Sequence, residues 1–140
     1  EARARRIAKK TQDICTFLDR IGFEAPGSAR GDGLSIAVHD ACHLVHAQGV
    51  RDAPRRLLAQ LRNVTLLHPA ESELCCGSAG TYSLFQPGIS SELRERKLEQ
   101  LQQPGASAIA TANIGCMTHL NEKSDLPVIH WLTLVARSIN

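Results

Sequence analysis

The sequence predicts a three-layer α/β fold, in which a parallel sheet of about four strands carries helices on both faces. One helix-like segment is followed by four strand-like segments, each of which leads into a helix-like segment. The strand-like segments are short, mostly apolar and rich in β-branched residues and alanine, which is typical of strands covered on both sides. The chain has 140 residues, of which 43% are hydrophobic and 21% charged, so a single core suffices. This alternation favours a doubly wound parallel sheet.

We expect the chain to begin with an amphipathic helix over about residues 2–21. Its buried stripe is formed by apolar residues at helical spacing, namely Ile7, Ile14, Leu18 and Ile21. Gly22 ends this helix, and the Pro- and Gly-rich stretch 24–33 forms a connection. Cys15 lies beside the stripe, and we expect it to be a small buried hydrophobic residue rather than a ligand.

The remaining elements follow from short apolar runs and from residues that start or stop helices. Asp52 and Pro54 favour a helix start, and Pro104 with Gly105 ends the longest helix. The expected strands are 34–39, 64–68, 107–112 and 127–130. The expected helices are 52–62, 88–102, 115–120 and 131–138, with a helical turn at 82–85. The residues expected to face inward from the longest helix are Ile89, Leu93, Leu98 and Leu101.

Residues 1–140 are expected to form a single domain, with a helix and a connection in 1–33 and the α/β core in 34–140. The chain begins at helical period on Glu1 rather than on a methionine, so we expect a C-terminal fragment of a longer subunit. The formal net charge of +2 is too small to indicate a nucleic-acid partner, and the basic residues of the first helix are expected to be solvated. No apolar run approaches the ~18 residues of a membrane span, and no signal peptide is evident.

Four of the five cysteines lie in short turns that follow predicted strands. Cys42 follows the first strand, Cys75 and Cys76 follow the second, and Cys116 follows the third. Loops at the carboxyl ends of parallel strands gather at one rim, so we predict that these thiolates share one soft metal centre. Four cysteines are the usual ligands of an iron–sulfur cluster and a common set for structural zinc. An odd cysteine count with two adjacent cysteines argues against a disulfide framework.

Glycines accompany the cysteines for a physical reason. Gly77, Gly80 and Gly115 allow the backbone to approach a bound group closely and to aim N–H groups at it. Such donors would stabilise the negative charge of a reduced centre and raise its potential. No pair of residues suited to acid–base catalysis stands out, so no catalytic residue is assigned.

The motifs around the cysteines resemble a known family. They are His39-Asp40-Ala41-Cys42-His43, Cys75-Cys76-Gly77-Ser78-Ala79-Gly80-Thr81-Tyr82 and Thr111-Ala112-Asn113-Ile114-Gly115-Cys116. The cysteine spacing resembles the cysteine-rich CCG domain of heterodisulfide reductases and of iron–sulfur subunits of flavin-linked dehydrogenases. The motifs are most similar to the C-terminal CCG repeat of the glycolate oxidase iron–sulfur subunit, over residues 34–135.

The resemblance implies an electron-transfer module of an oxidoreductase, with a [4Fe-4S] type cluster held by Cys42, Cys75, Cys76 and Cys116 beside Gly77 and Gly115. The implied partners are flavin-containing dehydrogenase subunits that oxidise glycolate or another 2-hydroxy acid, and the missing N-terminal part of the same chain. FAD would be bound only by the partner subunits. The implied location is cytoplasmic, at the inner face of the cytoplasmic membrane, with peripheral association through the complex and electrons passing to a membrane acceptor. The fragment is not expected to be catalytic alone.

The third motif departs from the family pattern, because Cys116 is followed at the third position by His119 instead of a second cysteine. Histidine ligates iron and zinc, so His119 is a candidate metal ligand. The alternative is a solvent-facing histidine that caps the turn. His39 and His43 are expected to be supporting donors or core histidines rather than ligands.

Two other functions stay open at this point. The same thiolates would suit a zinc-bound or metal-free structural or subunit-interaction domain, with zinc as a substitute for the cluster. Alternatively, Cys75 and Cys76 would form a strained vicinal disulfide in a thiol redox module.

Overall fold

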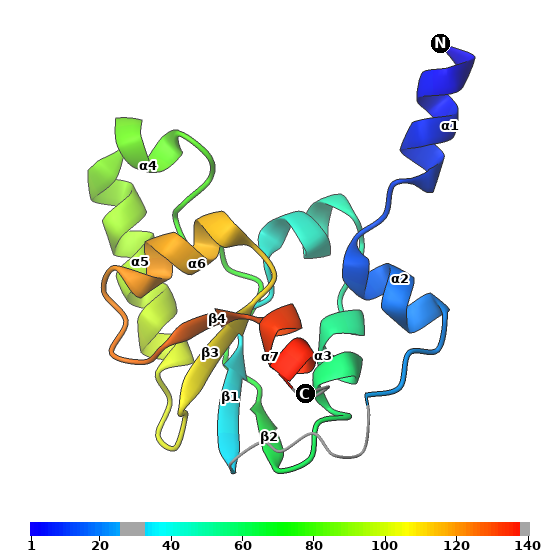
Figure 1. Cartoon of the computed structure of the whole chain (residues 1–140). Coiled ribbons are helices and arrows are strands. Elements are labelled where there is room, and N and C mark those ends of the chain that lie inside the picture. Colours follow the sequence, from blue (N-terminus) through cyan, green and yellow to red (C-terminus); the bar gives the residue numbers. More distant parts are fainter. Residues whose placement is uncertain (26–32, 138–140) are drawn as a thin grey trace.

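The central feature of the computed structural model is a four-stranded, all-parallel sheet with strand order β2-β1-β3-β4 (Figure 1). The structure describes residues 1–25 and 33–137, so most of the connection predicted at 24–33 lies outside the described residues. The strands are β1 (Leu34–Val38), β2 (Val64–Leu67), β3 (Ala108–Thr111) and β4 (Val128–His130). The predicted parallel α/β fold is confirmed.

Helices surround this sheet. They are α1 (Ala2–Lys10), α2 (Ile14–Arg20), a π-helical turn η1 (His43–Ala47), α3 (Ala53–Leu58), α4 (Tyr82–Phe85), α5 (Pro87–Leu101), α6 (Ile114–Asn121) and α7 (Trp131–Arg137). The bounds of most elements agree with the predicted ones to within a residue or two, although α3 ends earlier than expected. The turn η1, which directly follows Cys42, was not predicted.

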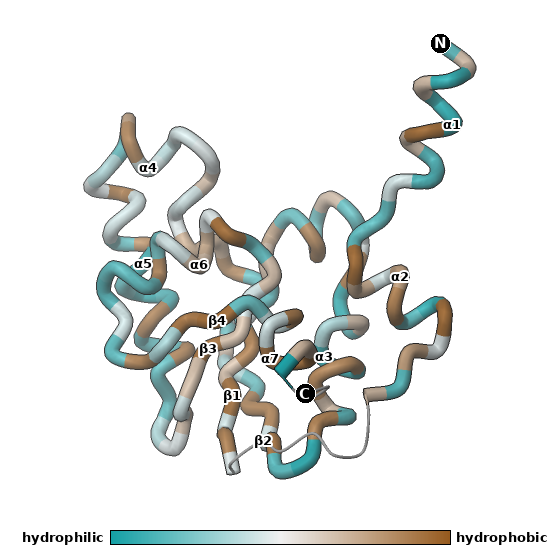
Figure 2. Tube along the Cα trace, in the orientation of Figure 1, coloured by the Kyte–Doolittle hydropathy of each residue, from teal (hydrophilic) through white to brown (hydrophobic). Residues whose placement is uncertain are grey.

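The two faces of the sheet pack against different helices. One face carries Ile36 and Val38 of β1 and packs under α2, α3 and α7, with Trp131 fully buried in this core. The other face carries Ala37 of β1 and Ile109 of β3 and packs under α5 and α6, together with Cys76 and Cys116. Apolar segments accordingly concentrate on the strands and on the helix sides that meet them (Figure 2). Cys76 and Cys116 therefore lie on the α5–α6 face of the sheet.

The single helix predicted over residues 2–21 was wrong. The chain leaves the helical conformation at Thr11, and a new helix begins after Asp13, whose side chain accepts a hydrogen bond of 2.9 Å from the backbone N–H of Cys15. An aspartate at this position competes with helix continuation because it caps the next helix. The helix α1 projects away from the body, and Ile7 is 67% exposed (Figure 1). The predicted stripe thus remains outside the core, apart from Leu18, which packs against it.

The buried side of α5 is more polar than its apolar residues predicted. Leu98 and Leu101 are buried as expected, but Ile89 is 50% exposed. Ser90, Arg94 and Lys97 are buried instead. Because these residues recur four and three positions apart, they share one face of the helix with Leu101. Polar side chains on a buried helix face indicate that this face covers polar groups.

A membrane-spanning helix is absent from the described residues, since none of their helices is both long and apolar enough for one.

Replacing Trp131 with alanine is expected to lower the free energy of unfolding by about 3–5 kcal/mol, because it removes the largest buried side chain of the α3–α7 core. Urea denaturation followed by circular dichroism measures this loss. The control Leu84→Ala, at a side chain that is 76% exposed, should change stability by less than about 0.5 kcal/mol. Similar losses for the two variants would show that the core is not centred on Trp131.

Candidate metal centre

Three loops from the carboxyl ends of adjacent strands meet at one rim of the sheet. Cys42 follows β1, Cys75 and Cys76 follow β2, and Cys116 lies in the first turn of α6 after β3. Since β1 lies between β2 and β3, the three strand ends are neighbours. The predicted convergence of the cysteine loops therefore follows directly from the strand order.

The thiols of Cys76 and Cys116 form the buried half of the cluster. A hydrogen bond from Cys116, supported by the nearby His39 and by the backbone N–H of Ser78, lowers the pKa of Cys76 to about 4. The same hydrogen bond, together with burial, raises the pKa of Cys116. The hydrogen bond between the two thiols therefore favours ionisation of Cys76 over that of Cys116. Thiolates are the form of cysteine that binds metals.

Cys42 and Cys75 form the second half, which is only partly buried. Burial raises the pKa of the Cys75 thiol, and the nearby thiols of Cys76 and Cys42 raise it further. Charge on Cys76, Cys42 and Cys75 also contributes to the raised pKa of Cys116. Cys42 and Cys75 thus lie near the buried pair, although of the four cysteines only Cys76 and Cys116 belong to the described group of ligand-type atoms within 4.8 Å of one another.

His39 extends this cluster from the centre of the sheet. It follows β1 directly, is 2% exposed, and its backbone N–H donates to the carbonyl of Ala110 at 2.8 Å. One ring nitrogen of His39 and the sulfurs of Cys76 and Cys116 all lie within 4.8 Å of one another. From the sequence, His39 was expected to be a supporting or core residue, but the structure places it among the ligand-type atoms.

Gly77 fixes the turn after the two cysteines. Its backbone N–H donates to the Sγ of Cys75 at 3.4 Å, and its carbonyl accepts from the Oγ of Ser90 at 2.9 Å. Its φ of +92° lies in the region that favours glycine, and an added Cβ would lie 2.4 Å from the carbonyl oxygen of Ser90. The turn can therefore approach α5 this closely only with glycine at this position.

Asn113 and Gly115 fix the turn that carries Cys116. The side chain of Asn113 caps α6 by accepting a hydrogen bond of 3.1 Å from the N–H of Cys116. A Cβ on Gly115 would meet both the Oδ1 of Asn113 and the Oγ of Ser78 at 3.1 Å. The Cys116 turn and the Ser78 turn consequently pack tightly against each other. Whether Gly77 and Gly115 donate to a bound cluster stays a prediction.

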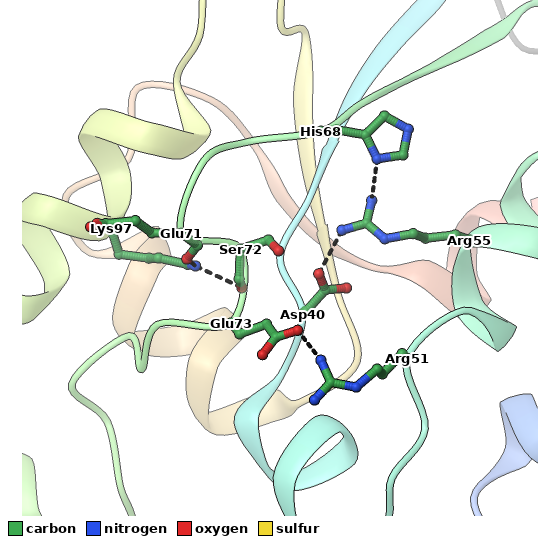
Figure 3. A network of polar contacts seen from close by, with 8 residues as sticks. All are labelled: Asp40, Arg51, Arg55, His68, Glu71, Ser72, Glu73 and Lys97. Carbon is green, nitrogen blue, oxygen red and sulfur yellow. Dashed lines mark hydrogen bonds and ion pairs between the residues drawn. The ribbon is translucent and has the colours of Figure 1, made fainter.

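A buried lysine holds the loop that precedes the two adjacent cysteines. The ammonium of Lys97, on α5, donates to the backbone carbonyls of Glu71 at 2.6 Å and Ser72 at 2.8 Å (Figure 3). Burial lowers its pKa to about 8, while Asp40, Cys76, Glu71 and Cys116 act in the opposite direction. Glu71 has a φ of +51°, which is strained for a residue with a side chain. Lys97 thus stabilises a strained loop and places a positive charge near the thiols.

Two ion pairs connect the same rim to α3 and to the segment that precedes α3. Arg55 donates to Asp40 at 2.6 Å, and both side chains are largely buried. Arg55 also lies 3.3 Å from the Nδ1 of His68 at the end of β2. Arg51 pairs with Glu73, just before Cys75 (Figure 3). These contacts connect the Cys42 loop and the Cys75 loop through one network of charges.

The candidate ligand His119 lies elsewhere. Its Nε2 is 3.2 Å from the Oγ of Ser90 and 3.4 Å from the carbonyl oxygen of Ser90. It is buried rather than solvent-facing, which was the alternative expected for it. Its role as a ligand stays a prediction. Cys15 is fully buried in the other core, where burial raises its pKa to about 12, in agreement with a non-ligand.

The residues at the rim fit a thiolate-bound metal centre. The donor set contains four thiols, and the surroundings of Cys76 lower its pKa and so favour the thiolate. Both ring nitrogens of His39 are buried; the thiol of Cys76 accounts for one, and the other has no hydrogen-bond partner among residues 1–25 and 33–137. Buried polar atoms without partners are rare in folded proteins and indicate a group that would satisfy them. The Gly77 turn, whose N–H donates to the Sγ of Cys75, lies beside these groups.

This fold and this site define a class, that of an α/β domain with a cysteine-rich centre at the carboxyl rim of its parallel sheet. Residues 36–121 match the family model described as the CCG cysteine-rich domain, and the chain belongs to that family.

Curated relatives align over most of the chain. It is 36% identical over 137 residues to the glycolate oxidase iron–sulfur subunit of Escherichia coli (strain K12), an alignment that covers 98% of this chain and 33% of the relative. It is 30% identical to lactate utilization protein A of Oceanobacillus iheyensis, over 89% of this chain and 52% of the relative. It is 32% identical to lactate utilization protein A of Anoxybacillus flavithermus, over 86% and 50% respectively. The chain thus spans a third to a half of the length of these relatives.

Replacing Gly77 with alanine is expected to destabilise the domain by about 1–3 kcal/mol from the backbone conformation alone, with a further loss from the contact with Ser90. The matched control is Gly80→Ala, which shares a positive φ of +62° but whose Cβ would have no atom within 4 Å. Urea unfolding of both variants measures the difference. Equal losses would mean that the close approach to α5 has no importance for stability.

Proposed function

We propose that this chain is an electron-transfer domain in which Cys42, Cys75, Cys76 and Cys116 hold an iron–sulfur cluster of the [4Fe-4S] type. The observation that supports this most strongly is that the loops carrying the four cysteines leave the same ends of three adjacent parallel strands. Ligation by four cysteines is the usual arrangement for such clusters. Such a cluster takes up one electron and passes it on.

The residues around the thiols would adjust the potential of that centre. The N–H of Gly77 already donates to Cys75, and hydrogen bonds to ligand sulfur raise a reduction potential. The buried ammonium of Lys97 favours the more negative, reduced state. The nearby carboxylates are neutralised, since Glu71 is paired with Arg96 and Glu73 with Arg51. We therefore propose a site arranged to accept an electron.

The relatives suggest the larger assembly. One is named as the iron–sulfur subunit of a glycolate oxidase, and the others as lactate utilization proteins. Glycolate and lactate are both 2-hydroxy acids. We propose that this domain works within a cytoplasmic, flavin-linked 2-hydroxy-acid dehydrogenase. It would receive electrons from a flavin-containing subunit and pass them toward an acceptor at the membrane.

A single metal ion is the alternative that a specific observation favours. His39, Cys76 and Cys116 offer three ligand atoms within 4.8 Å of one another, which suits a zinc site. A vicinal disulfide has less support, because the pKa of Cys75 is influenced by Cys42 and that of Cys76 by Cys116. Each of the two adjacent thiols thus interacts with a thiol from another loop.

Anaerobic reconstitution of the chain with iron and sulfide should yield about four of each per chain and an EPR signal on reduction. Serine variants of Cys42, Cys75, Cys76 or Cys116 should lose most of the cluster, because a ligand is removed. The control Cys15→Ala, far from the site, should retain it. Stoichiometric zinc in anaerobically purified protein, with no uptake of iron and sulfide, would instead support the single-ion alternative.

Lys97→Met is expected to lower the reduction potential of the reconstituted centre, since a positive charge near Cys76 and Cys116 is lost. A redox titration followed by EPR measures the shift. Lys123→Met removes the same charge from an exposed position and serves as the control. Because solvent screens an exposed charge, that variant should shift the potential much less. An unchanged potential in Lys97→Met would show that this ammonium only supports the loop.

A further inference from the structure

We infer that His39 is a nitrogen ligand of the metal centre, acting together with Cys76 and Cys116. This inference deepens the proposed function and rests on it for the cluster, but the three-residue site can be tested with a single metal ion. It also replaces His119 with His39 as the histidine of the site.

The position of His39 is unusually well fixed for a ligand. It directly follows β1, a strand that has hydrogen-bonded neighbours on both sides. Its N–H donates to the carbonyl of Ala110 on β3, so its backbone still belongs to the sheet. The register pairs Ala37 with Ile109, and both residues face the α5–α6 core. His39 lies two positions beyond Ala37 and therefore points to the same face, where Cys76 and Cys116 lie.

The polar atoms at this place lack partners. In the part of the chain that the structure describes, the Oγ1 of Thr111 and at least one ring nitrogen of His39 are buried without a hydrogen-bond partner. Thr111 lies two positions beyond Ile109, on the strand beside His39. Leaving such a group without a hydrogen-bond partner destabilises the folded state. Two of these groups side by side, next to the sulfur of Cys76, indicate a bound group that completes their interactions.

The distances suit metal ligation after a small contraction. Zinc–sulfur bonds of about 2.3 Å and zinc–nitrogen bonds of about 2.0–2.1 Å place tetrahedral ligand atoms about 3.5–3.8 Å apart. The ligand-type atoms of His39, Cys76 and Cys116 lie within 4.8 Å of one another. A metal would have to draw them together by about 1.3 Å at most. Since His39 is held by the sheet, the two cysteine turns would make most of this movement.

His119 does not offer the same geometry. Its Nε2 is within 3.2 Å of the Oγ of Ser90, and Ser90 in turn donates to the carbonyl of Gly77. His119 is therefore engaged in holding α6, α5 and the Gly77 turn together. Its nitrogen is not part of any group of close ligand-type atoms among the described residues.

Nitrogen ligation has a redox consequence. Where histidine replaces cysteine on iron in an iron–sulfur cluster, the reduction potential is higher, because a neutral ligand replaces an anionic one. A cluster in which His39 takes the place of one of the four thiolates would therefore be a better electron acceptor than one held by all four. The substitution His39→Cys is expected to lower the potential.

Titration of the anaerobic, metal-free chain with Co²⁺ tests this ligand set. The wild-type chain should bind Co²⁺ with thiolate charge-transfer bands and a strongly shifted imidazole proton resonance. His39→Ser should bind at least about tenfold more weakly and lose that resonance. His39→Cys, nearly identical in size to serine, should bind nearly as tightly as wild type. His119→Gln should retain both the affinity and the resonance.

The two variants at position 39 separate ligation from packing. If serine and cysteine weaken binding equally, or if His39→Ser binds as tightly as wild type, His39 is not a ligand. Loss of the shifted resonance in His119→Gln rather than in His39→Ser would also overturn the inference. If iron and sulfide fail to assemble while Co²⁺ binding depends on His39, the cluster proposal falls and the ligand assignment stands. If a cluster assembles with the same potential in wild type and His39→Cys, the cluster proposal stands and the assignment falls.

Discussion

The pairing of β1 with both β2 and β3 is the constraint on which the centre depends. The register aligns Ala37 with Leu67 on one side and Val38 with Ala110 on the other, so the three strands end at nearly the same level. The loops that leave these strand ends therefore lie next to one another. Cysteines that are distant in sequence become neighbours without any local motif. The hydrogen bonds of the backbone, rather than contacts among the side chains, thus assemble the site.

Ion pairs compensate the charged side chains around the site that the sheet assembles. Several carboxylates and thiols crowd the rim, and the carboxylates are matched by cations on a nearby helix or its approach, as in the pairs of Asp40 with Arg55 and Glu73 with Arg51. Lys97 is the exception, because it bonds backbone carbonyls and keeps its charge free to act on the thiols. A buried ammonium without a paired carboxylate is costly in a stable fold. Negative charge gained by the site when it is occupied and reduced would offset the free-energy cost of burying this ammonium.

The sequence predicted the layers, the four strands and the gathering of the cysteines, because each rests on periodicity or on the order of elements along the chain. It failed where tertiary contacts decide between local alternatives. Asp13 caps a second helix and so interrupts a continuous apolar pattern. On the polar face of α5, Lys97 is buried because its ammonium bonds the Glu71 loop. The sequence alone would place this lysine in solvent, because the helix around it is rich in charged residues. His39 was undervalued for a similar reason, since strand alternation shows which face it takes but not what faces it.

The two faces of the sheet differ in polarity and in what they contribute to the molecule. The face under α3 and α7 is apolar and closed around Trp131, and it holds most of the buried hydrophobic residues. The face under α5 and α6 contains two cysteines within a smaller apolar cluster, and its helix α5 turns Ser90, Arg94 and Lys97 inward. A polar, partly unsatisfied interior is tolerable on one side because the other side supplies the packing energy. The domain can therefore remain folded while polar groups such as the ring of His39 are buried on one face of the sheet.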